Sequence, residues 1–464
     1  MHRSKREIVA IALVCTAVAG CIEEEVPMPE GTTGEGAFFS ALYGPGIGTE
    51  EMEVARATER GVLIGGFSDG FDDEDGDGWL VELDPAGRFV SQGTLGGKGA
   101  EMILDLVVLD DGGIVGTGWT QSAGAGGYDV WCFRLTSDRD VVWSYAYGGE
   151  GAEQGWSITP TTSGNFVVAG GTTSFGAGGS DLWLLEIDGA GMPVWQKALG
   201  GPADDAGAGD FEEFTARVME TPTGRLVAVT ETQSFGAGDA DVWALGLDGD
   251  GSVLWQNAYG GADEDTVWSA ALANDGRVMV PAVTSSFGPD GSGDVWWLVL
   301  DEDGGLLTQR VLGEPGIYDE PISVVPTFDG GAVLGVSGYP EGAWQDILLR
   351  LDADGMPLWH RRYDMGWSWT NALVADADEA ITVAGVYWGG DPQPDVMDLW
   401  VMRLSFDGDL TACDRIEDTD LHVEETAAVV TSTSAVETPT MVEPVPADVT
   451  WTTTQDRPRY YCGP

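Results

Sequence analysis

The amino-acid sequence predicts an all-β protein: a seven-bladed β-propeller of four-stranded antiparallel blades, with a small β-rich C-terminal tail. The first supporting observation is an apolar segment, clearest at residues 181–187, that begins Asp-Leu-Trp and precedes a glycine-containing turn. The second is its recurrence at steps of 51 to 60 residues, a period near that of propeller blades. The third is composition, with 69 glycines for tight turns and 19 tryptophans to fill space between twisted sheets. The aromatic position of the segment holds, in turn, Trp79, Trp131, Trp183, Trp243, Trp296, Ile347 and Trp400.

One repeat shows how each blade is expected to form. Four segments of this repeat are rich in strand-forming side chains: 156–161, 166–171, 181–187 and 194–199. A turn at 162–165 separates the first two segments, and a turn at 188–191 separates the last two. A Ser-Phe-Gly-Ala-Gly loop at 174–178 precedes the third strand, and Gly200-Gly201 leads to the next repeat. Four short antiparallel strands make one blade.

The order of the repeats predicts how the ring closes. The first strand of the propeller, at 37–43, has the sequence pattern of the fourth strand of a blade. The last full strand, at 398–404, has the pattern of the third strand. A ring must hide its first and last sheet edges, so we expect the opening strand to complete the last blade, with residues 409–413 competing for that place. The propeller is therefore assigned to 37–410. Residues 411–464 break the pattern and are interpreted as a β-rich tail, not an eighth blade.

The N-terminus predicts export and lipid attachment. Residues 1–20 have a basic start, a short apolar run and small residues at the end, as in a signal peptide. The sequence Val18-Ala19-Gly20-Cys21 resembles the lipobox of bacterial-type lipoproteins, which implies cleavage before Cys21 and a lipid on its sulfur. The alternative is an ordinary secretory peptide cut near Gly20. Residues 21–36 form an acidic Gly/Pro tether, and the expected location is the cell envelope, at the outer membrane or the cell surface.

The net charge of the chain argues against anionic binding partners. With 77 acidic and 21 basic residues the formal net charge is −56, which argues against binding nucleic acid or anionic lipid head groups. A solvated acidic surface is the simplest interpretation, and the expected state is a monomer. Because carboxylates at this density repel one another, we expect greater stability in moderate salt or calcium than in dilute buffer.

The cysteines predict one disulfide. If Cys21 carries lipid, Cys413 and Cys462 can pair in an oxidising compartment, where they would bracket the tail. Cys132, within a strand, is expected to be a buried free thiol.

The repeats resemble a mostly uncharacterised family of bacterial and archaeal exported propeller proteins. The shared pattern is the Ser-Phe-Gly-Ala-Gly loop, the Asp-x-Trp strand and the Leu-Asp-x-x-Gly turn before a further Trp, and it covers about 37–410. A looser similarity to quinoprotein propeller repeats rests on Leu247-Asp248 to Trp255. The resemblance implies the fold and no particular activity.

Acidic residues give one candidate metal site. Asp73, Asp75 and Asp77 match the opening of a calcium loop, although position twelve is Asp84 rather than Glu. The aspartate two residues before each Trp is expected to accept hydrogen bonds from the preceding Gly-rich loop, with a ring of ligating carboxylates as the alternative. The recurrent tryptophans are expected to pack between blades.

No catalytic constellation stands out, since only His360 and His422 remain after the signal peptide. We therefore predict a lipid-anchored binding or scaffold module for protein or glycan partners, with loops 68–77, 202–213 and 388–397 and the aromatics Trp344 and Trp388 as places for contact. The alternatives are a polysaccharide-acting hydrolase or lyase on the same scaffold, and a purely structural spacer.

Overall fold

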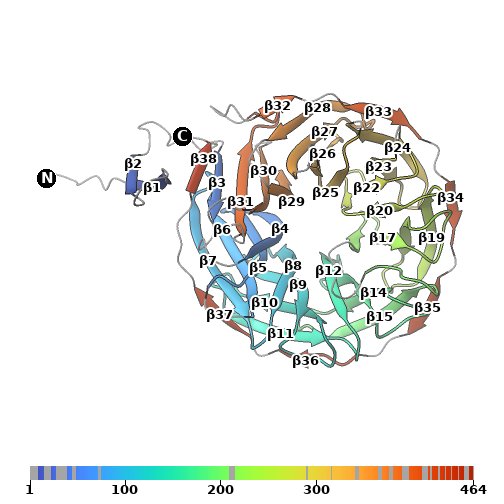
Figure 1. Cartoon of the computed structure of the whole chain (residues 1–464). Coiled ribbons are helices and arrows are strands. Elements are labelled where there is room, and N and C mark those ends of the chain that lie inside the picture. The colour runs from blue at the N-terminus through green and yellow to red at the C-terminus, as the bar shows by residue number, and fades with distance from the viewer. Residues whose placement is uncertain are drawn as a thin grey trace.

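The structure is a ring of seven antiparallel β-sheets around a central axis, which confirms the predicted seven-bladed propeller (Figure 1). The computed structural model describes residues 9–14, 22–27, 39–43, 49–71, 75–207, 215–288, 291–314, 316–339, 344–363, 368–375, 380–388, 397–409, 416–418, 421–426, 429–433, 435–439, 442–447, 449–453 and 459–462. No helix is present among these residues, so none of them forms a helix long and apolar enough to cross a bilayer.

Five blades take four consecutive strands from the repeats, and blade 5 takes five. In order from the axis outward, blades 1 to 3 are β4 (Glu50–Thr58), β5 (Gly61–Ser68), β6 (Asp77–Leu83) and β7 (Phe89–Gly96); β8 (Glu101–Val108), β9 (Ile114–Thr120), β10 (Asp129–Leu135) and β11 (Val141–Tyr147); and β12 (Glu153–Pro160), β13 (Phe166–Thr172), β14 (Asp181–Ile187) and β15 (Pro193–Gly200). Blade 4 has β16 (Arg217–Glu220), β17 (Leu226–Thr232), β18 (Asp241–Leu247) and β19 (Val253–Gly260).

Blade 5 divides its innermost position between two short strands. It consists of β20 (Asp265–Val267) and β21 (Ala271–Leu272), then β22 (Val278–Thr284), β23 (Asp294–Leu300) and β24 (Leu306–Gly313). Blade 6 is β25 (Asp319–Pro326), β26 (Ala332–Gly338), β27 (Gln345–Leu351) and β28 (Pro357–Tyr363).

The opening strand completes blade 7, as the order of the repeats predicted. This blade contains β29 (Ser368–Ala375), β30 (Ile381–Trp388) and β31 (Met397–Leu404), and its fourth strand is β3 (Phe39–Tyr43) from the start of the propeller. Ala41 of β3 lies opposite Val401 of β31 in an antiparallel pair. The ring is thus closed by hydrogen bonds between the two ends of the repeat region.

The tail is a belt around the ring, an arrangement the sequence did not predict. Each of its strands adds a fifth, outermost strand to one blade, and the belt visits the blades in the reverse of chain order, ending on blade 7 (Figure 1). Because every fourth strand would otherwise present unpaired N–H and C=O groups, the belt covers all seven sheet edges. The belt strands, for blades 6, 5, 4, 3, 2, 1 and 7, are β32 (Ile416–Asp418), β33 (His422–Glu425), β34 (Val429–Ser432), β35 (Val436–Pro439), β36 (Val445–Pro446), β37 (Thr450–Thr453) and β38 (Arg459–Cys462).

The hydrophobic core lies between blades rather than within them. One cluster combines Val130 and Cys132 of blade 2 with Trp183 and Leu185 of blade 3, and six similar clusters join the other neighbours. The recurrent tryptophans are 0–1% exposed, which confirms that they pack between blades. Since each sheet depends on both neighbours for burial, the stable unit is the closed ring.

One junction inverts the packing pattern. Between blades 3 and 4, Leu184 of the earlier blade packs in one cluster with Trp243 of the later one. Between blades 5 and 6 the later blade supplies Ile347, and the earlier blade supplies Trp297. The tryptophan side chain thus comes from the earlier blade at this junction and the smaller side chain from the later one. The summed side-chain volume of the pair is therefore similar at both junctions.

A separate two-stranded antiparallel sheet, β1 (Val9–Val14) with β2 (Ile22–Pro27), precedes the propeller. Cys21, the predicted lipid attachment site, lies outside the described residues.

Candidate functional site

The recurrent aspartate anchors the Gly-rich loop before its strand, as predicted. Asp181 accepts hydrogen bonds on Oδ2 from the main-chain N–H groups of Ala177 (3.0 Å) and Gly178 (3.3 Å), and Asp241 does the same in blade 4. Gly176 has φ 113°, and a Cβ there would lie 2.1 Å from Asp181 Oδ2. Phe175 of the loop packs against Trp183, with the ring centroids 5.7 Å apart. These contacts explain why the motif repeats as a unit.

A second recurrent carboxylate was missed from the sequence. Glu153, at the start of β12, accepts hydrogen bonds from Thr172 Oγ1 (2.9 Å) and from the main-chain N–H of Gly149 (2.7 Å). The sequence signal is an acidic residue four positions after the second glycine of a Gly-Gly pair. The buried members with this bond are Glu101, Glu153, Asp205 and Asp265.

The structure describes only part of the calcium candidate. Asp73 lies outside the described residues, Asp75 is exposed, and Asp77 opens β6. Asp77 Oδ1 faces Gly96, where a Cβ would lie 1.8 Å from it and 2.8 Å from Glu101 Oε2. Among the described residues, no three His, Cys, Asp or Glu side chains lie close enough together to hold a metal ion.

Other predicted positions have mixed outcomes. Cys132 is a fully buried free thiol that lies 3.6 Å from Thr117 Oγ1, and burial raises its pKa to about 12. Cys413 lies outside the described residues, and Cys462 ends the last belt strand. Parts of the three candidate loops, 72–74, 208–214 and 389–396, also lie outside them.

The two candidate aromatics belong to small aromatic clusters. Trp344 is half-buried beside Tyr339 (5.1 Å between ring centroids) and Tyr318 (6.3 Å). Tyr339 is 43% exposed and Tyr318 36%. Trp388 is half-buried and packs edge-on against Trp369 at 6.1 Å.

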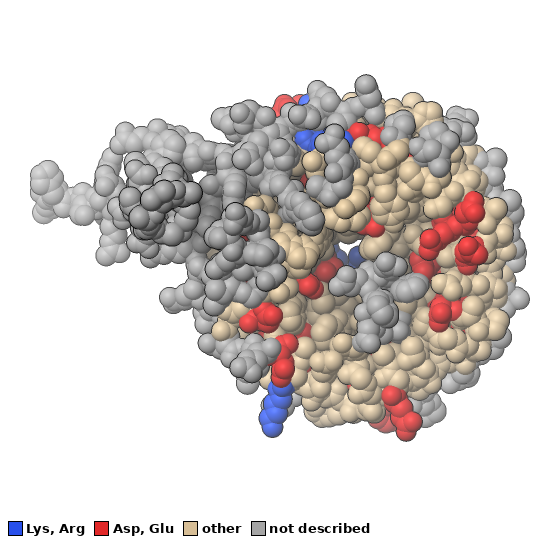
Figure 2. Space-filling model, viewed as in Figure 1, with Lys and Arg blue, Asp and Glu red and all other residues tan. Residues whose placement is uncertain are grey.

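The best candidate site is the channel on the propeller axis. A cavity of about 440 Å³ is lined by the innermost strands of all seven blades, and this volume is within the range of small-ligand sites. The space-filling view shows the opening at the centre of the ring, with acidic and basic side chains at depth (Figure 2). The described residues that line it include no histidine and no cysteine.

β-Bulges shape the channel wall. The register shifts between Gly155 and Ser157 in β12, between Ile103 and Asp105 in β8, and at the same level in β4, β25 and β29. A bulge inserts one residue into a strand and changes the direction of the neighbouring side chains, some of which are polar residues of the channel wall. The residue type differs from blade to blade, and for this reason no repeat in the sequence identifies it.

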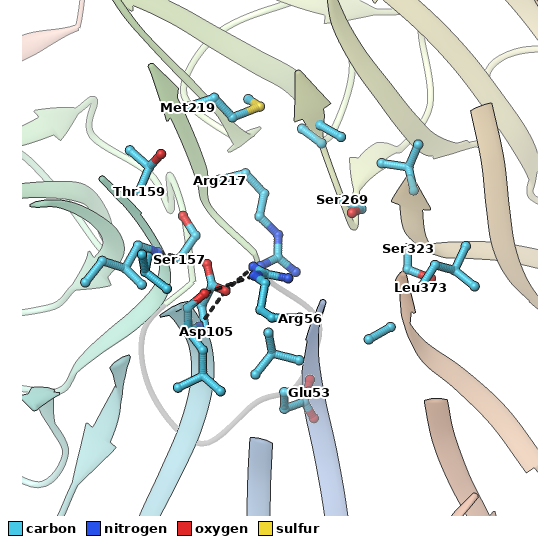
Figure 3. Close-up of a pocket in the computed structure, with 18 of the residues that line it drawn as sticks. Glu53, Arg56, Asp105, Ser157, Thr159, Arg217, Met219, Ser269, Ser323 and Leu373 are labelled. Carbon is cyan, nitrogen blue, oxygen red and sulfur yellow. Dashed lines mark hydrogen bonds and ion pairs between the residues drawn. The ribbon is translucent and has the colours of Figure 1, made fainter. Parts of the chain in front are cut away.

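Asp105 links three blades at the channel wall. Its carboxylate forms an ion pair with Arg56 of blade 1 and accepts a hydrogen bond from the main-chain N–H of Ile158 of blade 3 at 2.9 Å (Figure 3). It also accepts the N–H of Leu106 at 2.7 Å, and Arg56 Nε donates to the carbonyl of Leu106 at 2.9 Å. Because both carboxylate oxygens are occupied, Asp105 is a structural link rather than a free acid or base.

Arg217, on β16 of blade 4, points toward the same ion pair (Figure 3). Its Nη1 donates to the carbonyl oxygen of Trp156 at 3.2 Å, whereas its buried Nε has no hydrogen-bond partner. Burial lowers the pKa of the guanidinium, and nearby Arg56 lowers it further, while Asp105 opposes the shift. Arginine keeps its charge through such shifts, so a charged donor faces the channel.

Among the described residues that line the channel, three buried polar atoms have no hydrogen-bond partner. They are Arg217 Nε, a donor; Asn371 Oδ1, an acceptor; and Ser323 Oγ, which can be either. They come from blades 4, 7 and 6, so they surround the axis. Since buried polar atoms in proteins are nearly always satisfied, this channel suits an occupant that can both donate and accept hydrogen bonds.

Comparison with known proteins gives only distant structural similarity. No family model and no curated protein matches the sequence. Among solved structures, a puromycin hydrolase is 15% identical, with 83% of this chain and 57% of that chain covered and a TM-score of 0.46. An α-L-arabinanase of Penicillium chrysogenum is 13% identical (65% and 93% covered, TM-score 0.41), and the polysaccharide lyase Uly1 is 9% identical (65% and 90%, TM-score 0.37).

Proposed function

We propose that this protein is an exported, lipid-anchored binding module whose axial channel receives one end of a glycan. The observation that carries the proposal is the mixed set of unpartnered polar atoms on the channel wall, at Arg217, Ser323 and Asn371. A sugar hydroxyl both donates and accepts, so a glycan end in the channel matches a wall that carries donors and acceptors.

Charge favours a neutral glycan over an anionic ligand. An anion would accept from Arg217 but could not donate to the Asn371 carbonyl oxygen. The net charge of −56 would also repel it during approach. The lining itself is balanced, because Arg56 and Arg217 face Glu53 and Asp105.

The aromatic cluster of Tyr318, Tyr339 and Trp344 supplies a second surface of the right kind. Its partly exposed rings offer flat apolar area with polar edges, against which the C–H face of a sugar can pack.

The test is binding of the full chain, solubilised in detergent, to neutral and acidic oligosaccharides on an array, followed by calorimetry on any that bind. We expect neutral glycans to bind and Arg217→Gln to weaken binding at least tenfold. The matched control is Arg225→Gln, whose side chain pairs with Asp303. A bound glycan that tolerates Arg217→Gln and Ser323→Ala equally well would contradict the channel as the site.

The enzyme alternative is favoured by one observation, the convergence of Glu53 and Asp105 with two arginines. Glycoside cleavage normally uses two carboxyl groups, and Asp105 already uses both oxygens in structural bonds. We therefore rank binding first. Release of reducing ends from a bound oligosaccharide, lost in Glu53→Gln, would instead establish a hydrolase or lyase.

Lipid attachment rests on the motif that ends at Cys21. Metabolic labelling with a fatty acid should mark the wild-type chain and leave Cys21→Ser unlabelled. An unlabelled wild type, with an N-terminus cut near Gly20, would support the ordinary secretory peptide.

A further inference from the structure

A pair of carboxylates lies at several junctions between blades, and each pair faces one glycine. The first member is the loop-anchoring aspartate of one blade, and the second is the acid after the Gly-Gly pair that begins the next blade. A Cβ on Gly200 would lie 1.8 Å from Asp181 Oδ1 and 3.1 Å from Asp205 Oδ2. The glycine therefore gives the two carboxylates room to face the same point.

The pairs are of two kinds. Where the second acid is Glu153, its Oε2 lies 2.5 Å from the Cβ position of Gly148, and both oxygens of its partner Asp129 accept loop N–H groups. Where the second acid is Asp265, its Oδ2 is 3.0 Å from the equivalent point on Gly260. The aspartate is one methylene shorter, and its carboxylate oxygen lies further from this point.

Two of the Asp–Asp pairs leave a buried oxygen without a hydrogen-bond partner. Asp181 and Asp241 are 0% and 1% exposed, and Oδ1 of each is buried with no hydrogen-bond partner. Their other oxygens hold the loops, and the facing aspartates accept a Thr hydroxyl and a Gly N–H. A buried anionic oxygen beside another carboxylate is costly unless a positive charge compensates it.

The surroundings of these two pairs are acidic. Burial is the main cause that raises the pKa of Asp181 to about 6, with repulsion from Asp205 and Asp204 adding to it. Burial likewise raises the pKa of Asp265, and Asp241 contributes. The junction between blades 5 and 6 differs because it contains an arginine. Arg362 donates hydrogen bonds to Glu314 there, and its positive charge lowers the pKa of Asp319 against the effect of burial.

We propose that the Asp181–Asp205 and Asp241–Asp265 pairs each bind one divalent cation, with Ca²⁺ the best fit. Two carboxylates that approach the same glycine, one of them with an unpartnered oxygen, suit a hard cation, which takes oxygen ligands at about 2.4 Å and completes its shell with carbonyls or water. Each cation joins two adjacent blades and neutralises the least compensated charges of the ring. These sites are distinct from the loop candidate at Asp73 and Asp75.

The test uses a substitution that the protein itself contains at other junctions. Asp205→Glu and Asp265→Glu keep the charge and recreate the Asp–Glu pair of blades 2 and 3. Calcium binding to the full chain in detergent is measured by calorimetry at constant ionic strength, with the melting temperature of each variant as a check on folding. The control is Asp239→Glu, the same change at an exposed position.

We expect each junction variant to bind one Ca²⁺ fewer than wild type, and the double variant two fewer, while Asp239→Glu binds the wild-type number. Equal stoichiometry in wild type and the folded double variant would overturn the proposal. So would a wild type whose stability responds to pH but not to Ca²⁺, because each pair would then share a proton.

Discussion

Ser40, in the opening strand of the propeller, lies opposite Cys462, near the end of the chain, in the outermost sheet pairing of blade 7. The first propeller strand is therefore bonded on both sides, by β31 and by β38. Both ends of the described ring meet in one blade.

Removal of β38 tests the contribution of the belt at this seam. A chain that ends at residue 453 exposes the outer edge of β3, and we expect the free energy of unfolding to fall by about 2–4 kcal/mol, since a few main-chain hydrogen bonds are lost. The uncovered edge should also promote self-association. Urea unfolding and gel filtration under reducing conditions, which remove any contribution of a Cys413–Cys462 disulfide, measure both effects against a chain ending at residue 462. Identical curves would mean that the belt adds nothing here.

The Cys413–Cys462 disulfide stays a prediction, and the belt gives it a context. The described belt begins with β32 on blade 6 and ends with β38 on the neighbouring blade 7. A disulfide between these cysteines would close a loop of about 50 residues and stabilise the fold by about 4 kcal/mol. Unfolded, unreduced, lipidated protein should show one free thiol, from Cys132, and three after reduction. Three thiols without reduction would rule out the bond.

The inverted packing of Trp297 and Ile347 predicts strong coupling. Trp297→Leu leaves a cavity and Ile347→Trp overfills the junction, so each should cost about 2–4 kcal/mol. The double variant recreates the Leu–Trp arrangement of the junction between blades 3 and 4 and should recover most of this loss. Chemical denaturation of the four proteins gives the coupling energy. Additive losses would show that the two side chains do not compensate.

Buried acids predict a pH effect in the presence of a chelator. Burial raises the pKa of Asp181 to about 6, of Asp346 to about 7 and of Asp319 to about 8, from 3.8. The folded state then keeps protons that the unfolded state releases, so stability falls as pH rises from about 4 to about 8. Melting temperatures in EDTA should be higher at pH 5 than at pH 8. Asp319→Asn should reduce the fall in melting temperature near pH 8. A rise in stability over this range would contradict these assignments.

The sequence repeat made the fold predictable. The residues of the channel depart from the repeat, so the sequence did not predict the candidate site. Trp183 and Asp181 recur at fixed offsets because every blade needs the same packing and the same loop anchor. The channel residues Asp105, Ser157 and Arg217 occupy one level of successive blades but differ in type, so no period marks them. The belt was equally hidden, since its strands join the blades through main-chain hydrogen bonds, which carry no side-chain pattern.

The position of β3 between two antiparallel neighbours also sets how the propeller bears mechanical load. Tension applied from the N-terminal side enters the ring through β3 and runs along the strand, so the hydrogen bonds to β31 and β38 resist it together, in shear. A force perpendicular to the strand would instead break these hydrogen bonds one at a time. A propeller held by its first strand in this way resists tension on that strand without opening blade by blade.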